Sequence, residues 1–192
     1  MLSFFYLCTA IGVLINVIYA NIYIELVVHI LHFITYFMLC FSLSFLLVFV
    51  LLVAKSNRII DKKVQVSIIV VFGLLLLGLL LFPNGITINE STNWKPEWSW
   101  SFFIYSIIVC SMMVIAPTSY YSIKIYRKFE HPKLKKKWIY FLIGVFGYYF
   151  LYYGTSLSNT LADPTFRVIW SIISLPTLIG SYFIYYGVAK TI

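Results

Sequence analysis

Long runs of apolar residues are the feature that most restricts how this chain can fold. One of them reads SIIVVFGLLLLGLLLF, and no charged residue interrupts it. A strand of a membrane β-barrel would alternate polar and apolar residues, and this run does not. Because backbone polar groups inside a bilayer must be paired within the spanning structure, a continuous apolar run predicts a membrane-spanning helix.

Six stretches are suited to this role, since a helix needs roughly 20 apolar residues to cross a bilayer. They are approximately 2–22, 28–54, 65–83, 99–122, 138–157 and 167–189. The chain is 62% hydrophobic and only 10% charged, whereas a soluble domain carries about 25% charged residues. We therefore expect an all-α integral membrane protein, a bundle of six transmembrane helices that forms one domain over residues 1–192.

The basic residues are distributed unevenly between the connections. All Lys and Arg residues except Lys95 and Arg167 lie between the second and third stretches, between the fourth and fifth, or after the sixth. Connections on the cytoplasmic side of a membrane carry an excess of such residues. The pattern predicts a multi-pass protein of the cell (plasma) membrane with both termini in the cytoplasm.

The segment ELVVHILH places Glu25, His29 and His32 on one face of the second predicted helix, at its outer start. Histidines whose charge changes near neutral pH could make this a pH sensor. A metal site would need a further ligand from another loop. The acidic residues on the same side are Glu90, Glu97 and Asp163. A third interpretation is a polar helix start in the headgroup zone, where both histidines are easily hydrated.

Two outer stretches, FPNGITINESTNWKPEWSW and GTSLSNTLADPTF, combine aromatic, hydroxyl and amide side chains. This mixture suits a shallow pocket for an amphiphilic ligand, for which the first stretch could be a lid. It suits an ordinary membrane interface equally well, with the tryptophan N–H groups reaching water. The candidate ligand-binding residues are Glu25, His29, His32, Trp98, Asn159 and Asp163.

The inner segment KIYRKFEHPKLKKKW is strongly basic. Such a cluster beside a helix end attracts the anionic headgroups of membrane lipids. It could also dock a cytoplasmic or membrane protein, or simply hold the topology; nucleic acid is not expected as a partner. The residues of this predicted docking surface are Lys124, Arg127, Lys128, Lys133, Lys135, Lys136 and Lys137.

Signatures of catalysis are missing from the sequence. It contains no GxSxG, HExxH, Walker A or CxxC motif. Cys8, Cys40 and Cys110 all fall in apolar stretches, where a thiol is typically a small buried hydrophobe. No Asp, Glu, Lys or Arg is expected at mid-bilayer, which disfavours an ion-driven transporter. We expect no catalytic residue, no metal and no cofactor.

The last third of the chain reads KKKWIYFLIGVFGYYFLYYGTSLSN, followed by WSIISLPTLIGSYFIYYGVAK. These residues, 135–190, resemble the end of the seven-helix membrane sensor region of histidine kinases. There, too, a basic loop precedes two helices, and the last contains a proline and ends in a YG–(V/I)–K pattern. This chain has six predicted spans, whereas that sensor region has seven, and no kinase domain follows. The resemblance implies an unattached sensor module and transfers no catalytic residue.

The combined pattern predicts a non-enzymatic membrane protein, a sensor-like module or accessory subunit. Its ligand region would lie at the outer rim and its docking surface in the basic inner loop. A small transporter, or transporter subunit, for an apolar or neutral solute is the first alternative. A lipid-modifying membrane enzyme is the second, and it would require a polar constellation that the sequence does not display.

Overall fold

The computed structural model describes residues 1–55 and 59–189, and most of them are helical. Within these ranges, five helices are long and apolar enough to cross a membrane: Leu2–Tyr19, Glu25–Lys55, Lys62–Leu81, Trp100–Lys128 and Pro164–Val188. The prediction of an all-α membrane protein is confirmed. The predicted span 138–157 lies inside another helix, α6 (Pro132–Leu161), whose many tyrosine and glycine residues lower its mean hydropathy.

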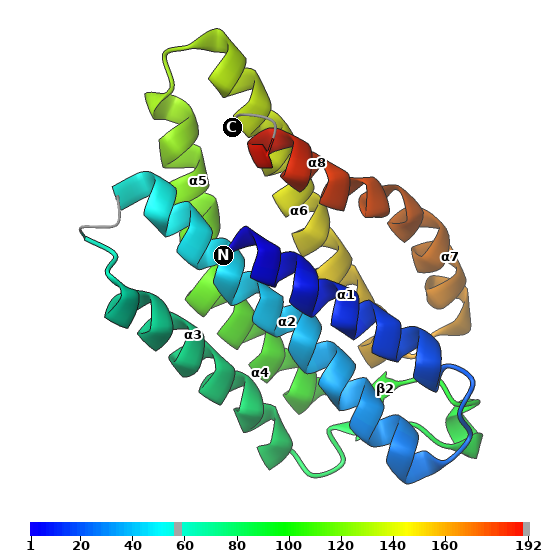
Figure 1. Cartoon of the computed structure of the whole chain (residues 1–192). Helices are drawn as coiled ribbons and strands as arrows, with labels where there is room; N and C mark the ends of the chain where they lie inside the picture. The colour runs from blue at the N-terminus through cyan, green and yellow to red at the C-terminus, as the bar shows by residue number, and fades with distance from the viewer. Residues whose placement is uncertain (56–58, 190–192) are drawn as a thin grey trace. The chain divides into compact units, whose positions relative to one another are not determined.

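The chain consists of two compact units, Met1–Ser119 (unit 1) and Tyr120–Ile192 (unit 2). Unit 1 begins with α1 (Leu2–Tyr19) and α2 (Glu25–Lys55), which are joined by a short connection. In Figure 1, α2 lies against α1 and also against α3 (Lys62–Leu77), which ends in a 3₁₀ turn, η1 (Gly78–Leu81). Thirteen residues of α2 are buried, against three of α1, so α2 is the central helix of this unit.

A small folded hairpin, residues 83–99, connects η1 to the next helix. Its strands β1 (Ile86–Thr87) and β2 (Glu97–Trp98) pair antiparallel, with Ile86 opposite Trp98. Between them lies the 3₁₀ turn η2 (Glu90–Thr92), which is held by reciprocal hydrogen bonds between Asn89 and Thr92. Ile86, Ile88 and Trp98 are buried. The longest predicted outer loop is therefore anchored to the bundle by its own apolar side chains.

The helix that follows the hairpin is not uniform. It runs as α4 (Trp100–Cys110), a π-helical turn η3 (Ser111–Ile115) and α5 (Ala116–Lys128). Proline has no N–H to donate, and its ring crowds the carbonyl four residues earlier in an ordinary α-helix. Pro117 is the second residue of α5, and the wider turn just before it relieves this crowding.

Unit 2 contains the end of α5, then α6, α7 (Pro164–Ser174), a 3₁₀ turn η4 (Leu175–Thr177) and α8 (Leu178–Ala189). Proline occupies the first position of both α6 and α7, where a missing N–H costs nothing. The Asp163 carboxylate accepts a 2.6 Å hydrogen bond from the backbone N–H of Phe166. Pro176 in η4 divides the last predicted span, 167–189, into two helices.

Helices α6 and α8 pack closely within unit 2. At their crossing, a methyl group on Gly144 would collide with the carbonyl oxygen of Gly180 and would lie 2.7 Å from the backbone nitrogen of Ile184. Small residues allow this kind of close approach between membrane helices. Aromatic rings flank the crossing, and those of Tyr140 and Tyr186 meet edge to face at 5.2 Å.

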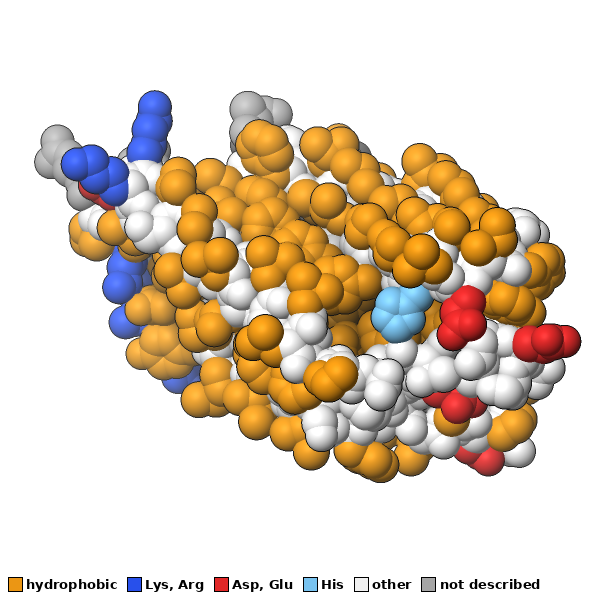
Figure 2. Space-filling view, turned by 90° about the horizontal axis from the view of Figure 1, so that it is seen from below, with side chains coloured by type: hydrophobic (Ala, Val, Ile, Leu, Met, Phe, Trp, Pro, Cys, Tyr) orange, Lys and Arg blue, Asp and Glu red, His pale blue; other side chains and the backbone are white. Residues whose placement is uncertain are grey.

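Hydrophobic side chains cover most of the surface that faces the viewer in Figure 2. Exposed apolar residues occur along several of the helices, for example Leu14 on α1, Leu74 on α3 and Ile108 on α4. A soluble protein rarely exposes continuous apolar patches of this extent. The surface therefore agrees with a protein whose helices face lipid.

Candidate functional site

Trp98, at the end of β2, is the residue that anchors the hairpin in unit 1. Only 5% of its surface is exposed. Its indole ring meets the ring of Tyr36 on α2 edge to face at 4.8 Å and that of Phe102 on α4 at 5.1 Å. The indole N–H donates to Nε2 of His32 at 3.2 Å. The expectation that this N–H reaches water is wrong, because His32 accepts it inside the protein.

His32 connects three elements of unit 1. Its Nε2 accepts from Trp98 on the hairpin, and its Nδ1 lies 2.8 Å from the hydroxyl of Tyr19 at the end of α1. An indole N–H can only donate, so Nε2 carries no proton in this arrangement. The proton of a neutral imidazole is then on Nδ1, from which it is donated to the Tyr19 oxygen. The site holds His32 as a neutral Nδ1–H tautomer.

A second polar pair lies one helical turn further along α2. The hydroxyl of Tyr36 forms a hydrogen bond with the hydroxyl of Ser106 on α4, and both residues are buried. Tyr36 also contacts the Trp98 ring, so the two polar pairs share one aromatic cluster. Buried groups that are fully hydrogen-bonded favour a single arrangement of the elements that carry them.

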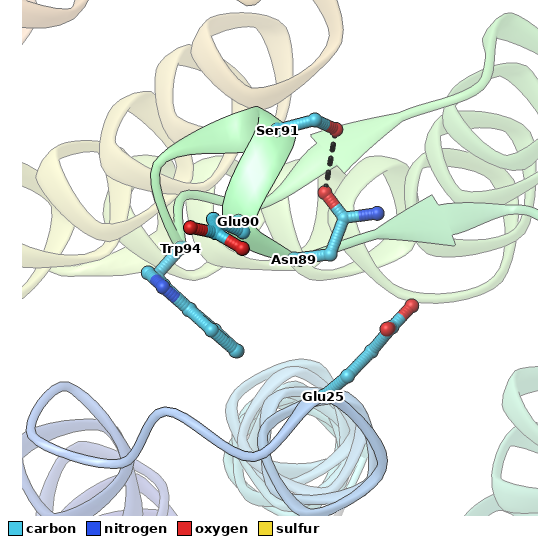
Figure 3. Close-up of a pocket in the computed structure, with 5 residues that line it drawn as sticks. All are labelled: Glu25, Asn89, Glu90, Ser91 and Trp94. Carbon is cyan, nitrogen blue, oxygen red and sulfur yellow. Dashed lines mark hydrogen bonds between the residues drawn. The ribbon is translucent and has the colours of Figure 1, made fainter.

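A shallow, open hollow of about 590 Å³ lies in unit 1, between the start of α2 and the hairpin. Its lining residues are Glu25, Asn89, Glu90, Ser91 and Trp94. In Figure 3, Glu25 and Trp94 stand on opposite sides of the hollow, and the side chains of Asn89 and Glu90 lie along the hairpin side. Ser91 points away from Glu25 and donates a 2.7 Å hydrogen bond to the Asn89 side-chain oxygen.

The hairpin holds Trp94 in an unusual backbone conformation. Asn93 and Trp94 both have positive φ angles, of 50° and 58°, and Trp94 N–H donates to the Asn89 carbonyl at 2.9 Å. Trp94 contacts Tyr23 of the α1–α2 connection, and the two rings meet edge to face with centroids 5.5 Å apart. The indole wall of the hollow is thus supported from both the hairpin and the α1–α2 connection.

The structure brings together only some of the residues predicted to bind a ligand. His32 and Trp98 are hydrogen-bonded to each other, and Glu25 lines the neighbouring hollow. The side chain of His29 is partly exposed, whereas that of His32 is buried. The expectation that both histidines are easily hydrated is therefore wrong for His32. Asn159 and Asp163 belong to unit 2.

The two unit 2 residues have ordinary local positions. Asn159 lies in the last turn of α6, and the Asp163 carboxylate caps the start of α7. No neighbouring side chain in unit 2 adds support for a ligand or metal role of Asn159 or Asp163. Within the described ranges, no group of three or more His, Cys, Asp or Glu side chains is placed to hold a metal ion.

Sequence reasoning did not include Tyr19 and Trp94 among the candidate residues of the unit 1 site, and it named Glu90 only as an acidic residue on the same side as the ELVVHILH segment. Tyr19 stands at the end of α1, and the short connection to α2 brings it back to His32. That short connection could have indicated from the sequence that Tyr19 approaches the start of α2. No comparable signal existed for Glu90 and Trp94, because their approach to Glu25 depends on how the hairpin folds over the bundle.

The predicted docking surface belongs to the hairpin of α5 and α6. Five of its side chains are exposed, and Lys135 and Lys137 are partly buried. The ammonium of Lys135 lies 5.0 Å from the centre of the Tyr126 ring, within the range of a cation–π interaction. A second contact joins the same two helices: the indole N–H of Trp138 on α6 donates to the carbonyl of Ser122 on α5 at 2.8 Å.

No family model, no curated protein and no solved structure matches this chain. The resemblance of residues 135–190 to the sensor region of histidine kinases stays a prediction, carried by the sequence motifs alone.

Proposed function

We propose that this protein is a non-enzymatic membrane module, sensor-like or an accessory subunit, in which the unit 1 hairpin carries the ligand region and the α5–α6 hairpin carries the docking surface. One observation carries this proposal: the hairpin is hydrogen-bonded to α1 and α2 through His32 and still leaves a ligand-sized hollow at its edge. A ligand there would contact α2 and the hairpin at once, and could change how they pack.

In the proposed topology, α6 is the fifth of six spans in chain order and both termini lie in the cytoplasm. No charged residue occurs from Trp138 to Leu161 of α6. At 1.5 Å per residue, this part of the helix is about 36 Å long, enough for a hydrocarbon core of about 30 Å. Six spans then place the hairpin outside the cell and the docking surface inside.

The charges of unit 1 support the same orientation. Lys55 ends α2 and Lys62 and Lys63 begin α3, whereas Glu25 begins α2 at its other end. The hairpin near Glu25 adds two further acidic residues, Glu90 and Glu97. Arg58 and Lys190, which contribute to the sequence pattern, lie outside the described residues. The basic end of these helices would face the cytoplasm of the cell.

The test of the docking role is a purification under mild conditions, followed by mass spectrometry of bound proteins and lipids. A variant with Lys133, Lys135, Lys136 and Lys137 changed to Gln should lose a partner or an anionic lipid that the unchanged protein retains. The matched control is K55Q/K62Q/K63Q, which removes charge from the other basic connection and should retain the same molecule. The proposal is contradicted if both variants behave alike, or if neither protein nor lipid is bound.

The alternative functions give different results in reconstituted liposomes. A transporter of an apolar or neutral solute would show flux of that solute without any partner and regardless of the four lysine substitutions. A lipid-modifying enzyme would change the lipids of the vesicle, and would lose this turnover when Glu25 or His29 is changed to Gln. For a sensor-like or accessory module, we expect neither flux nor turnover.

A further inference from the structure

We propose that Cys40 and Cys110 form an oxidation site, at which a hydroperoxide joins the two thiols in a reversible disulfide. The inference goes beyond the proposed function and does not depend on it. Three observations lead to it: the two thiols are in contact, they lie on facing helices of unit 1, and a π-helical turn begins directly after one of them.

Helices α2 and α4 bring the two cysteines opposite each other. Both helices begin at the end of unit 1 where the hairpin 83–99 lies, so they run in the same direction (Figure 1). The hydroxyl of Tyr36 on α2 pairs with that of Ser106 on α4. Side chains four residues apart share one face of a helix. Cys40 and Cys110 each follow this pair by four residues, so the register places them in the next layer of the same interface.

The contact between the side chains agrees with this register. The thiol of Cys40 forms hydrogen bonds with the thiol of Cys110 and with the hydroxyl of Tyr36. Both cysteines are free thiols, and no more than 1% of either is exposed. Two thiols that already touch need only a small movement to bring their sulfur atoms to the bonding distance of about 2.05 Å. By donating to the Cys40 sulfur, the Tyr36 hydroxyl would support the negative charge of an attacking thiolate.

The depth of the pair selects the oxidant. At 1.5 Å per residue, Cys40 lies about 22 Å along α2 from its first residue, Glu25. In a hydrocarbon core of about 30 Å, the pair is therefore surrounded by lipid and not by water. Met112, two residues after Cys110, is 71% exposed, so lipid would contact the helix at this level. An oxidant dissolved in the bilayer would reach the thiols more readily than one dissolved in water.

The π turn η3 gives oxidation a structural consequence. It starts at the residue after Cys110 and packs against α2. Turns of this kind occur frequently at functional sites inside α-helices. A disulfide would fix α2 to α4 where this turn begins, and would close a loop of roughly 70 residues that contains α3 and the hairpin. Oxidation would therefore stabilise unit 1 against unfolding.

The reaction consumes one hydroperoxide for each disulfide. The Cys40 sulfur attacks the terminal oxygen of the hydroperoxide, the O–O bond breaks, and the leaving alkoxide takes the thiol proton to become an alcohol. The Cys110 sulfur then attacks the sulfenic acid formed on Cys40. The S–O bond breaks, and the hydroxide that leaves takes the Cys110 proton to become water. The two thiols lose two electrons, which reduce the hydroperoxide, and a thiol reductant reverses the bond by exchange.

The hydroperoxide has two sources: an oxidised membrane lipid, or hydrogen peroxide from the water phase. The test uses the full chain in vesicles of dimyristoylphosphatidylcholine, whose saturated chains do not form peroxides. One sample receives cumene hydroperoxide, which dissolves in the bilayer, and another receives the same concentration of hydrogen peroxide. Remaining thiols are blocked with N-ethylmaleimide in SDS, and disulfide-linked peptides are measured by mass spectrometry. We expect a link between Cys40 and Cys110 that forms faster with cumene hydroperoxide and is removed by dithiothreitol.

Variants locate the reaction at the pair. C40A and C110A are matched controls, because each retains Cys8 and one member of the pair. Both should lose the cross-link within one chain. Size-exclusion chromatography checks that they are folded, and either one suffices if the other is not. A second measurement is the unfolding midpoint in SDS, which oxidation should raise for the unchanged protein and leave in place for C40A and C110A.

The relative rates distinguish the two sources of the oxidant. Faster cross-linking by cumene hydroperoxide indicates a lipid hydroperoxide, and equal or faster cross-linking by hydrogen peroxide indicates the water phase. The inference is overturned if neither compound links Cys40 to Cys110, if Cys8 is linked to either of them as readily, or if dithiothreitol does not restore the thiols. Docking through the basic α5–α6 surface would remain intact in each of these cases, so the proposed function is tested separately.

Discussion

The indole N–H of Trp98 donates to Nε2 of His32 at 3.2 Å, although the two residues are 66 positions apart in the chain. Because His32 also pairs with Tyr19 at 2.8 Å, one imidazole joins the hairpin, α1 and α2. Both ring nitrogens of His32 are hydrogen-bonded. Replacing Tyr19, His32 or Trp98 by an apolar residue would therefore leave a buried polar group without a partner. This small network holds the proposed ligand region in place.

Replacing Trp98 by Phe should destabilise the protein by about 1 kcal/mol or somewhat more. Phe is smaller than the buried indole, so part of the packing is lost, and Nε2 of His32 also loses its donor in a buried position. The measurement is the unfolding midpoint in mixed micelles of SDS and maltoside. The control is Trp100→Phe, since Trp100 is 56% exposed and should tolerate the same change. Equal shifts for the two variants would show that the hydrogen bond contributes nothing.

The protonation state of His32 is a direct spectroscopic prediction. With Trp98 as a donor to Nε2, the neutral ring must carry its proton on Nδ1. Nitrogen NMR of protein with ¹⁵N-labelled histidine at neutral pH should show this tautomer, with His32 assigned by comparison with H32Q. In W98F, where the donor is absent, the preference should weaken. A ring with its proton on Nε2 in the unchanged protein would contradict the arrangement described above.

Gly144→Ala should disrupt the packing of α6 against α8. The added methyl group would meet the Gly180 carbonyl and lie 2.7 Å from the Ile184 nitrogen, and backbone cannot move aside as a side chain can. Overpacking of this kind costs about 1–3 kcal/mol.

Gly147→Ala, on the same helix, is the matched control for this change. A methyl group at Gly147 has no atom within 4 Å, so its effect should be neutral or stabilising by about 0.5–1 kcal/mol. Both variants are measured by SDS unfolding. A similar loss for the two would show that α6 and α8 do not cross at Gly144.

Ala162→Gly should stabilise unit 2. Ala162 follows the last turn of α6 with a φ of 53° and donates its N–H to the Ser158 carbonyl, a conformation that glycine adopts without steric cost. We expect a gain of about 0.5–1 kcal/mol in unfolding free energy. Ala10→Gly in the middle of α1, where φ is helical, should lower stability by a similar amount. A loss of stability in both variants would contradict the left-handed cap.

Much of the fold could be predicted because it depends on local composition. The apolar run 28–54 became α2, Glu25–Lys55, and the basic segment with Pro132 became the boundary between α5 and α6. A chain in a bilayer has few ways to pair its backbone other than helices, so a run of this length indicates the element directly. The break at Pro176 was less visible, because proline is tolerated inside membrane helices and its effect depends on neighbouring contacts.

The ELVVHILH segment shows where prediction from sequence ends. Helical periodicity correctly places Glu25, His29 and His32 near one face of α2. Periodicity says nothing about what covers that face: here a hairpin from residues 83–99 buries His32 against Trp98 and leaves Glu25 at an open hollow with Glu90. The sequence by itself determined the membrane class, the helices and the charged and polar segments. Only the tertiary structure decided which side chains meet, because contacts between distant segments depend on packing in three dimensions.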